Sequence, residues 1–172
     1  MRTDISGGGA QRLTDEVITA FYQKHSLSVY RLCMSYLRDP EESADAVQET
    51  FLRWINCSDR PQGEQHEIGW LVMTAGNICR DMLRHRKRYK RESIESACDI
   101  GKEERAFNDR ELFDVVCSLP DKYKNVIFLF YYEDMTTAQI CEVTGMKQST
   151  VTSLLTRARR LLKKALGDDI NG

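Results

Sequence analysis

The most constraining feature of this chain is a pair of helical patterns near its end, separated by one glycine. Segment 136–144 opens with Thr136 and Gln139 in the order T-x-x-Q, which is the capping box that begins a helix. Gly145 follows it, and glycine readily adopts the left-handed conformation that ends a helix. Segment 148–164 then repeats apolar residues at spacings of three and four. Two helices joined through a glycine turn are the layout of a helix-turn-helix, whose second helix lies in the major groove of DNA.

The second of these helices divides into an apolar stripe and a polar face. The stripe expected to pack inward consists of Val151, Leu155, Ala158, Leu162 and Ala165. In a recognition helix, early residues reach base edges and later basic residues contact phosphates. The residues predicted to contact duplex DNA are Gln148, Ser149, Thr150, Thr152, Ser153, Thr156, Arg157, Arg159 and Arg160.

Charge is sorted into blocks along the chain, although the net charge is only −1. Residues 80–91 contain seven basic side chains and one acidic side chain, whereas residues 92–121 contain three and nine. Because salt screens charges beyond roughly 10 Å, a polyanion responds to these local blocks and not to the net charge. Cations are favourable at any helix C-terminus, but seven of them exceed what capping requires. Such density indicates contact with phosphates.

An aromatic ring and an amide lie just upstream of this basic block. Bases stack on aromatic rings with about 1–3 kcal/mol each, and an amide reads base edges, so the combination is typical of single-strand binding. Packing of Trp70 in the core is the competing interpretation. The residues predicted to contact a single strand are Trp70, Asn77, Arg80, Arg84, Arg86, Lys87 and Arg88.

The whole chain is predicted to be all-α, because it has three prolines, little strand-like alternation and recurrent apolar spacings of three and four. We expect a first helix over 14–37, either continuous or interrupted near Ser26, and a second that begins with Asp39 as N-cap and Pro40 as first residue. Two small helical domains joined by an acidic flexible linker follow from the pattern. The predicted boundaries are a flexible tail at 1–12, a first domain at 13–91, the linker at 92–111 and a second domain at 112–170.

Asp45, Gln48 and Glu49 share one face of the second helix, because their spacing is three and four. On its own, such a polar edge is usually a solvated face.

Several functions are not expected. The six cysteines form no C-x-x-C pair and none lies one turn from a histidine, so we predict neither a metal site nor a disulfide framework. No set of nucleophile, base and orienting group is apparent, so we predict neither catalysis nor a cofactor. No apolar run approaches the roughly 20 residues that span a bilayer, and residues 1–12 lack the apolar core of a secretory signal. We therefore expect a cytoplasmic protein without membrane insertion.

Taken in order, four motifs resemble the extracytoplasmic-function sigma factors, the compact two-domain class of bacterial transcription initiation factors. They are the segment DAVQETFLRW, the segment GWLVMTAGNICRDMLR, a Leu-Pro pair and the segment TRARR, at residues 45–54, 69–84, 119–120 and 156–160. The recognition helix departs from the family, which often has Lys-Ser-Arg where this chain has Thr152, Ser153 and Leu154.

The resemblance implies a division of labour between the two domains. Asp45, Gln48 and Glu49 would bind core RNA polymerase, and the first domain would capture the melted non-template strand of the −10 element. Residues 149–160 would read the −35 element as duplex DNA. An anti-sigma factor is implied as a further partner.

Two alternatives remain at this point. A stand-alone operator-binding regulator would use the helix-turn-helix alone and bind DNA tightly without polymerase. An all-α enzyme would need Asp45 and Glu49, or a cysteine with a histidine, to be catalytic.

Overall fold

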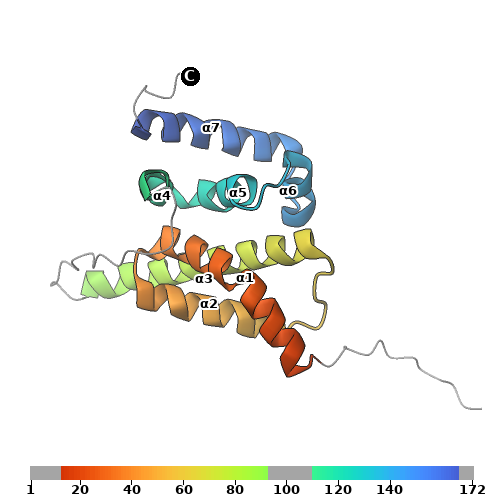
Figure 1. Cartoon of the computed structure of the whole chain (residues 1–172). Coiled ribbons are helices and arrows are strands. Elements are labelled where there is room, and N and C mark those ends of the chain that lie inside the picture. Colours follow the sequence, from red (N-terminus) through yellow and green to blue (C-terminus); the bar gives the residue numbers. More distant parts are fainter. Residues whose placement is uncertain (1–12, 93–109, 167–172) are drawn as a thin grey trace, which may run out of the picture.

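The computed structural model describes residues 13–92 and 110–166, and every regular element in these ranges is a helix. The N-terminal bundle consists of α1 (Asp15–Leu37), α2 (Pro40–Ile55) and α3 (Glu64–Glu92). The C-terminal bundle consists of α4 (Arg110–Ser118), α5 (Asp121–Tyr131), α6 (Thr137–Thr144) and α7 (Gln148–Leu166). In Figure 1 the C-terminal bundle is stacked on the N-terminal bundle, with α7 outermost. The all-α prediction is confirmed.

Local sequence sets the helix ends as predicted. The Asp39 carboxylate accepts the backbone N–H of Glu42 at 2.8 Å and caps α2, which begins at Pro40. Arg38, the residue before Asp39, adopts a left-handed conformation with φ of 54° and is the C-cap of α1, which ends at Leu37. A single turn therefore reverses the chain between α1 and α2.

Other expected details differ in the structure. Of the two options for the first helix, α1 is continuous through Ser26, because His25 and Val29 on either side are buried against the bundle. α3 begins at Glu64, inside the polar segment 58–65, whose Pro61 and Gly63 indicate a loop, and it continues to Glu92. α4 begins at Arg110, so both ends of the predicted linker are helical. The predicted tail and residues 93–109 of the linker lie outside the described residues.

The hydrophobic core runs without interruption through both bundles. α5 is its centre, because Val126, Ile127, Phe128 and Leu129 are each at most 1% exposed. α5 contacts α1 and α3 on one side and α6 and α7 on the other. Among the described helices, none combines the length and apolar character that crossing a membrane requires.

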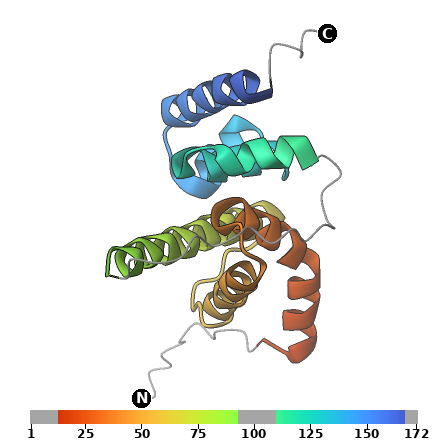
Figure 2. The same cartoon turned by 90° about the vertical axis from the view of Figure 1, so that its left-hand side faces the viewer.

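Buried polar groups join the two bundles. The hydroxyl of Tyr36 in α1 donates to Oδ1 of Asn125 in α5 at 2.8 Å. Nζ of Lys124, a residue only 4% exposed, donates to the carbonyl oxygen of Ser35 at 2.8 Å. Figure 2 shows α1 and α3 directly beneath the layer formed by α4, α5 and α6. These bonds satisfy side chains that burial would otherwise leave unpaired.

A partly buried carboxyl group, that of Glu133, lies at the same interface. Oγ of Ser28 in α1 donates to Oε1 of Glu133, just after α5, at 2.6 Å. Burial raises the pKa of Glu133 above its ordinary value, and Asp134 and Glu64 act in the same direction. The hydrogen bond from Ser28 and the charge of Arg31 oppose this rise but do not cancel it.

We predict that Glu133→Gln stabilises the protein at pH 7. A raised folded-state pKa means that the folded state binds the proton more tightly, so wild-type stability falls as pH rises through that pKa. The amide of the variant would carry no charge and still accept from Ser28. Urea unfolding between about pH 5 and about pH 8 should therefore give a flatter profile for the variant. Asp59→Asn removes a carboxylate from an exposed position that does not act on Glu133, and it should keep the wild-type slope. Equal slopes for Glu133→Gln and wild type would contradict the prediction.

Candidate nucleic-acid interface

The helix-turn-helix forms by the local signals that the sequence contains. The Thr136 hydroxyl accepts the N–H of Gln139, and Oε1 of Gln139 accepts the N–H of Thr136 at 2.8 Å. Gly145 has φ of 69° and ends α6 as predicted. The inward stripe of α7 is confirmed for Val151, Leu155, Ala158 and Leu162. Ala165 is exposed, because it lies in the last turn of α7, one residue before the helix ends.

The polar face of α7 is turned away from the rest of the molecule. Figures 1 and 2 both show α7 on the side of the stack opposite the N-terminal bundle. Ser153 is partly buried. The residues of this face that are exposed and form no side-chain hydrogen bond or ion pair with the described residues are Ser149, Thr150, Thr152, Thr156, Arg157 and Arg160.

Gln148 has a different environment from these residues. Its Nε2 donates to the hydroxyl of Thr137 at 2.9 Å, and its Oε1 accepts from the thiol of Cys141 at 3.2 Å. Both partners lie on α6. The amide therefore ties the first turn of α7 to the first helix of the motif, and both of its polar atoms are engaged in doing so.

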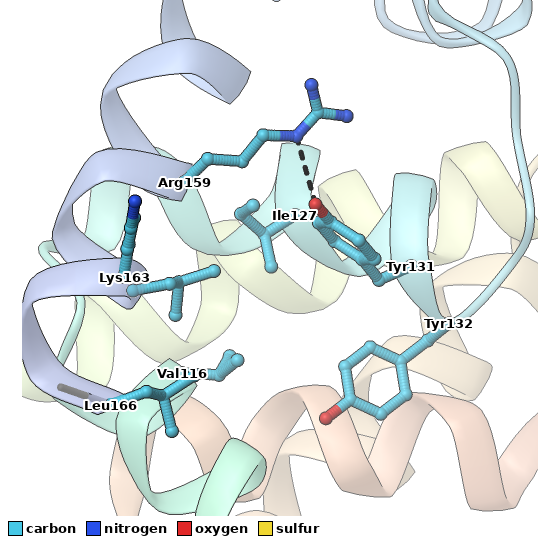
Figure 3. Close-up of a pocket in the computed structure, with 8 residues that line it drawn as sticks. Val116, Ile127, Tyr131, Tyr132, Arg159, Lys163 and Leu166 are labelled. Atoms are coloured by element: carbon cyan, nitrogen blue, oxygen red, sulfur yellow. Dashed lines mark hydrogen bonds between the residues drawn. The ribbon is translucent and has the colours of Figure 1, made fainter. Parts of the chain in front are cut away.

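Arg159 is directed toward α5 and not along the polar face. Its Nε donates to the hydroxyl of Tyr131 at 2.9 Å, and its guanidinium lies 4.8 Å from the centre of the Phe130 ring. Figure 3 shows the hydrogen bond between Arg159 and Tyr131 at the edge of an apolar groove between α4, α5 and α7. The groove has a volume of about 340 Å³, and sequence reasoning missed it. Its lining residues are Val116, Ile127, Tyr131, Tyr132, Arg159, Leu162, Lys163 and Leu166.

The basic block of α3 contains both paired and unpaired cations. Arg86 forms an ion pair with Glu42 of α2, and Arg84 pairs with Asp81 at 2.7 Å on the exposed surface. The Arg80 guanidinium donates to Oδ1 of exposed Asn77. Lys87 and Arg88 are exposed, so they add positive potential at the end of the helix. Trp70 is partly buried and packs against the core, which leaves only part of its ring accessible.

Asp45, Gln48 and Glu49 lie together in a shallow groove between α2 and α3 of about 410 Å³. Glu49 pairs with Arg53 one turn later at 2.7 Å, while Asp45 and Gln48 are exposed. The remaining lining residues are Leu52, Arg53, Ile78, Asp81, Met82 and His85. The polar edge of α2, which the sequence alone would indicate to be a solvated face, therefore borders a concave surface with an apolar floor.

No cluster of His, Cys, Asp or Glu within residues 13–92 and 110–166 has the arrangement of a metal site. The five cysteines in these ranges are free thiols, and burial raises the pKa of Cys117 to about 11.

Comparison with known families identifies both bundles. Residues 21–89 match the family model for Sigma-70 region 2, and residues 109–162 match that for Sigma-70, region 4. The chain belongs to the extracytoplasmic-function class of RNA polymerase sigma factors. It is thus a promoter-directing transcription initiation factor, and the stand-alone operator-binding regulator is not favoured.

Individual relatives agree with this assignment. The chain is 27% identical over 156 residues to the RNA polymerase sigma factor SigV of Bacillus subtilis, a match that covers 89% of this chain and 93% of that protein. It is 28% identical over 157 residues to the ECF sigma factor SigW of the same organism, covering 81% and 83%. The fold is similar to RpoE of Bartonella quintana, solved with the anti-sigma factor NepR, with a TM-score of 0.64 at 20% identity. That superposition covers 90% of this chain and 99% of RpoE.

We predict that Gln148→Ala acts through helix position and not through base reading. Losing two partly exposed hydrogen bonds to α6 should lower the free energy of unfolding by about 1 kcal/mol. Transcription from promoters with different −35 sequences should fall by one common factor, so that their order of preference is kept. Thr152→Ala, on the exposed face, should leave stability unchanged and alter the order of preference among −35 sequences. Thermal unfolding and transcription from a library of −35 variants measure the two effects. A changed preference with wild-type stability for Gln148→Ala would contradict the prediction.

Proposed function

We propose that residues 13–91 hold core polymerase and opened −10 DNA, while residues 112–170 hold the −35 element as duplex. The observation that carries this proposal is the presence of two outward surfaces, the basic end of α3 and the polar face of α7, on separate bundles. The role is one of binding, so no catalytic step is assigned to any residue. A factor of this kind acts in the cytoplasm, where polymerase and promoters meet.

The α2–α3 groove is the proposed site for core polymerase. Asp45 and Gln48 offer exposed polar groups at its rim, and Ile78 and Met82 supply an apolar floor. An apolar centre with a polar rim is the usual anatomy of a protein interface.

The proposed −10 surface begins beside Trp70 and Asn77 and continues along the cations of α3. Extruding a base from a duplex costs a few kcal/mol, so a preformed surface that stacks and bonds the base favours the opened state. Arg80, Arg84 and the exposed Lys87 supply charge for the strand's phosphates. Arg86 is held by Glu42 and is proposed to contribute potential more than direct contact.

The proposed −35 surface is the exposed face of α7. Ser149, Thr152 and Thr156 would meet base edges, and Arg157 and Arg160 would contact phosphates. Gln148 and Arg159 are proposed to position this helix, given their bonds to α6 and α5.

We also infer an anti-sigma partner. RpoE was solved with the anti-sigma factor NepR, and CnrH, which matches with a TM-score of 0.61, was solved with the cytosolic domain of CnrY. Such a partner would compete with polymerase for the exposed grooves of this chain.

The function is tested by promoter gel shifts with and without core polymerase. Specific binding should require core polymerase, because the proposal has both surfaces held on the same promoter at once. The double variant Asp45→Ala/Gln48→Ala should weaken core association by roughly tenfold, corresponding to loss of about 1.4 kcal/mol at the interface, with unchanged circular dichroism. Tight, specific binding by the free wild-type protein would favour an operator-binding regulator instead. Unchanged core association of the double variant would remove the α2–α3 groove from the interface.

Arg80→Ala/Arg84→Ala should abolish strand opening at the −10 element. With about 0.7 counterions released per single-strand contact, the slope of log affinity against log salt should fall by roughly 1.4. Permanganate reactivity of promoter thymines reports the opening. Lys24→Ala/Lys122→Ala removes the same charge from exposed positions on α1 and α5 and should open promoters normally. Normal thymine reactivity in Arg80→Ala/Arg84→Ala would exclude these side chains from melting.

A further inference from the structure

The apolar groove between α4, α5 and α7, which we call the α7 groove, has no role in the proposed function. Its floor consists of Val116, Ile127 and Leu162, which are 2%, 1% and 8% exposed. These side chains belong to the continuous core, so packing fixes the shape of the floor. The volume of about 340 Å³ lies at the lower end of the range for small-molecule sites, about 300–1,000 Å³.

One end of the α7 groove is cationic. Arg159 and Lys163 are four residues apart on α7, so their side chains project from the same face of the helix. Neither forms an ion pair within residues 13–92 and 110–166, and two like charges at this spacing repel each other. Figure 3 shows the nitrogen ends of both side chains directed toward the same, upper side of the view. An anionic group beside them would offset this repulsion.

The hydrogen-bond donors at the cationic end suit a carboxylate. The Tyr131 hydroxyl accepts from Nε of Arg159 at 2.9 Å and has its own proton to donate. The terminal nitrogens of Arg159 and Nζ of Lys163 form no hydrogen bond with the described residues. A guanidinium binds a carboxylate through two parallel hydrogen bonds, and an ammonium adds a compact charge. Three side chains at one end of the groove therefore offer donors to one anion.

The other end of the α7 groove is apolar. Leu166 lies seven residues after Arg159, which is about 10 Å along the helix at a rise of about 1.5 Å per residue. Figure 3 shows Leu166 and Val116 together at the end of the groove away from Arg159. A ligand that spans the groove would thus have a charged head and an apolar body of about that length.

We propose that the α7 groove binds a small amphipathic carboxylate, such as a medium-chain fatty acid. Its carboxylate would lie beside Arg159, Lys163 and the Tyr131 hydroxyl, and its apolar body would lie on the floor and reach Leu166. A small molecule fits better than a protein here. Eight residues line the groove, whereas a standard protein interface uses roughly 20–30 residues from each partner.

Decanoate is the probe that tests the site. Calorimetric titration of the full chain, below the concentration at which decanoate forms micelles, should show saturable binding of one ligand per chain. Each methylene added from hexanoate to decanoate should lower the Kd about fourfold, because each one is buried in the groove. Decanol has the same chain without the charge and should bind roughly tenfold more weakly. Methyl NMR signals of Val116 and Leu166 should shift on binding, and those of Ile78 in the α2–α3 groove should not.

Three variants separate the head of the ligand from its body. Lys163→Ala should weaken decanoate binding roughly tenfold and leave decanol binding unchanged, because only the carboxylate needs the cation. Lys164→Ala is the matched control, since it removes the same charge from the next exposed residue, which borders a different groove beside Leu161. It should bind decanoate as wild type does. Leu166→Trp fills the apolar end and should weaken both ligands.

Thermal unfolding gives a readout that does not depend on transcription. A ligand that binds only the folded state raises the melting temperature in proportion to the logarithm of its concentration. Decanoate should do so for the wild-type protein and for Lys164→Ala, and much less for Lys163→Ala. Circular dichroism without ligand checks that each variant is folded.

Failure of decanoate to bind saturably would overturn the proposal. Equal Kd values for decanoate and decanol would also overturn it, as would equal weakening by Lys163→Ala and Lys164→Ala. If decanoate binds only to a chain that ends at Leu166, residues 167–172 are the occupant of the groove and not a small molecule. If the Val116 and Leu166 signals shift with protein concentration alone, the occupant is a second copy of the chain, and the proposal is again wrong.

Discussion

Burial of α5 on every side is the constraint on which this arrangement depends. A helix that packs in all directions needs apolar side chains around its circumference and partners for every polar group it carries. Val126 to Leu129 meet the first requirement. Lys124 and Asn125 meet the second through Ser35 and Tyr36 of the other bundle. Lys124 and Asn125 lie on the side of α5 that faces the N-terminal bundle, and Phe128 lies between them on the same side, so this side is both polar and apolar.

The organisation of charge follows from the same packing. Cations near the bundle interior are neutralised, as Arg86 is by Glu42, or bonded to backbone, as Lys124 is. Cations at the far end of α3 and on the outer face of α7 remain exposed. A protein with a net charge of −1 thus offers two separate positive surfaces to nucleic acid, each effective over roughly one Debye length.

The features that the sequence alone predicted are those encoded within a few residues. The caps at Asp39 and Thr136, the turn at Gly145 and the buried stripe of α7 each depend on spacings of one helical turn, and the structure has all of them except the last residue of the stripe. The shared face of Asp45, Gln48 and Glu49 on α2 was also predictable, because three residues at helical spacing define one face. Its role in binding core polymerase stays a prediction.

Contacts between distant residues were not predictable from the chain. The contact of Arg159 with Tyr131 joins two helices whose relative angle no local pattern specifies. Gln148 was predicted to contact DNA because the pattern of its own helix places it on the polar face. That pattern does not reveal its two bonds to α6. Gly69 and Gly76 of α3 carried no turn or cap signal, because what requires glycine there is the close approach of side chains of α5 and α6, roughly 50 to 75 residues away.

The continuity of the core through both bundles has a consequence for unfolding. α5 shares its buried surface with α1 and α3 as well as with α6 and α7. Loss of either bundle would therefore remove packing from the other, and we expect the described residues to unfold in one cooperative transition.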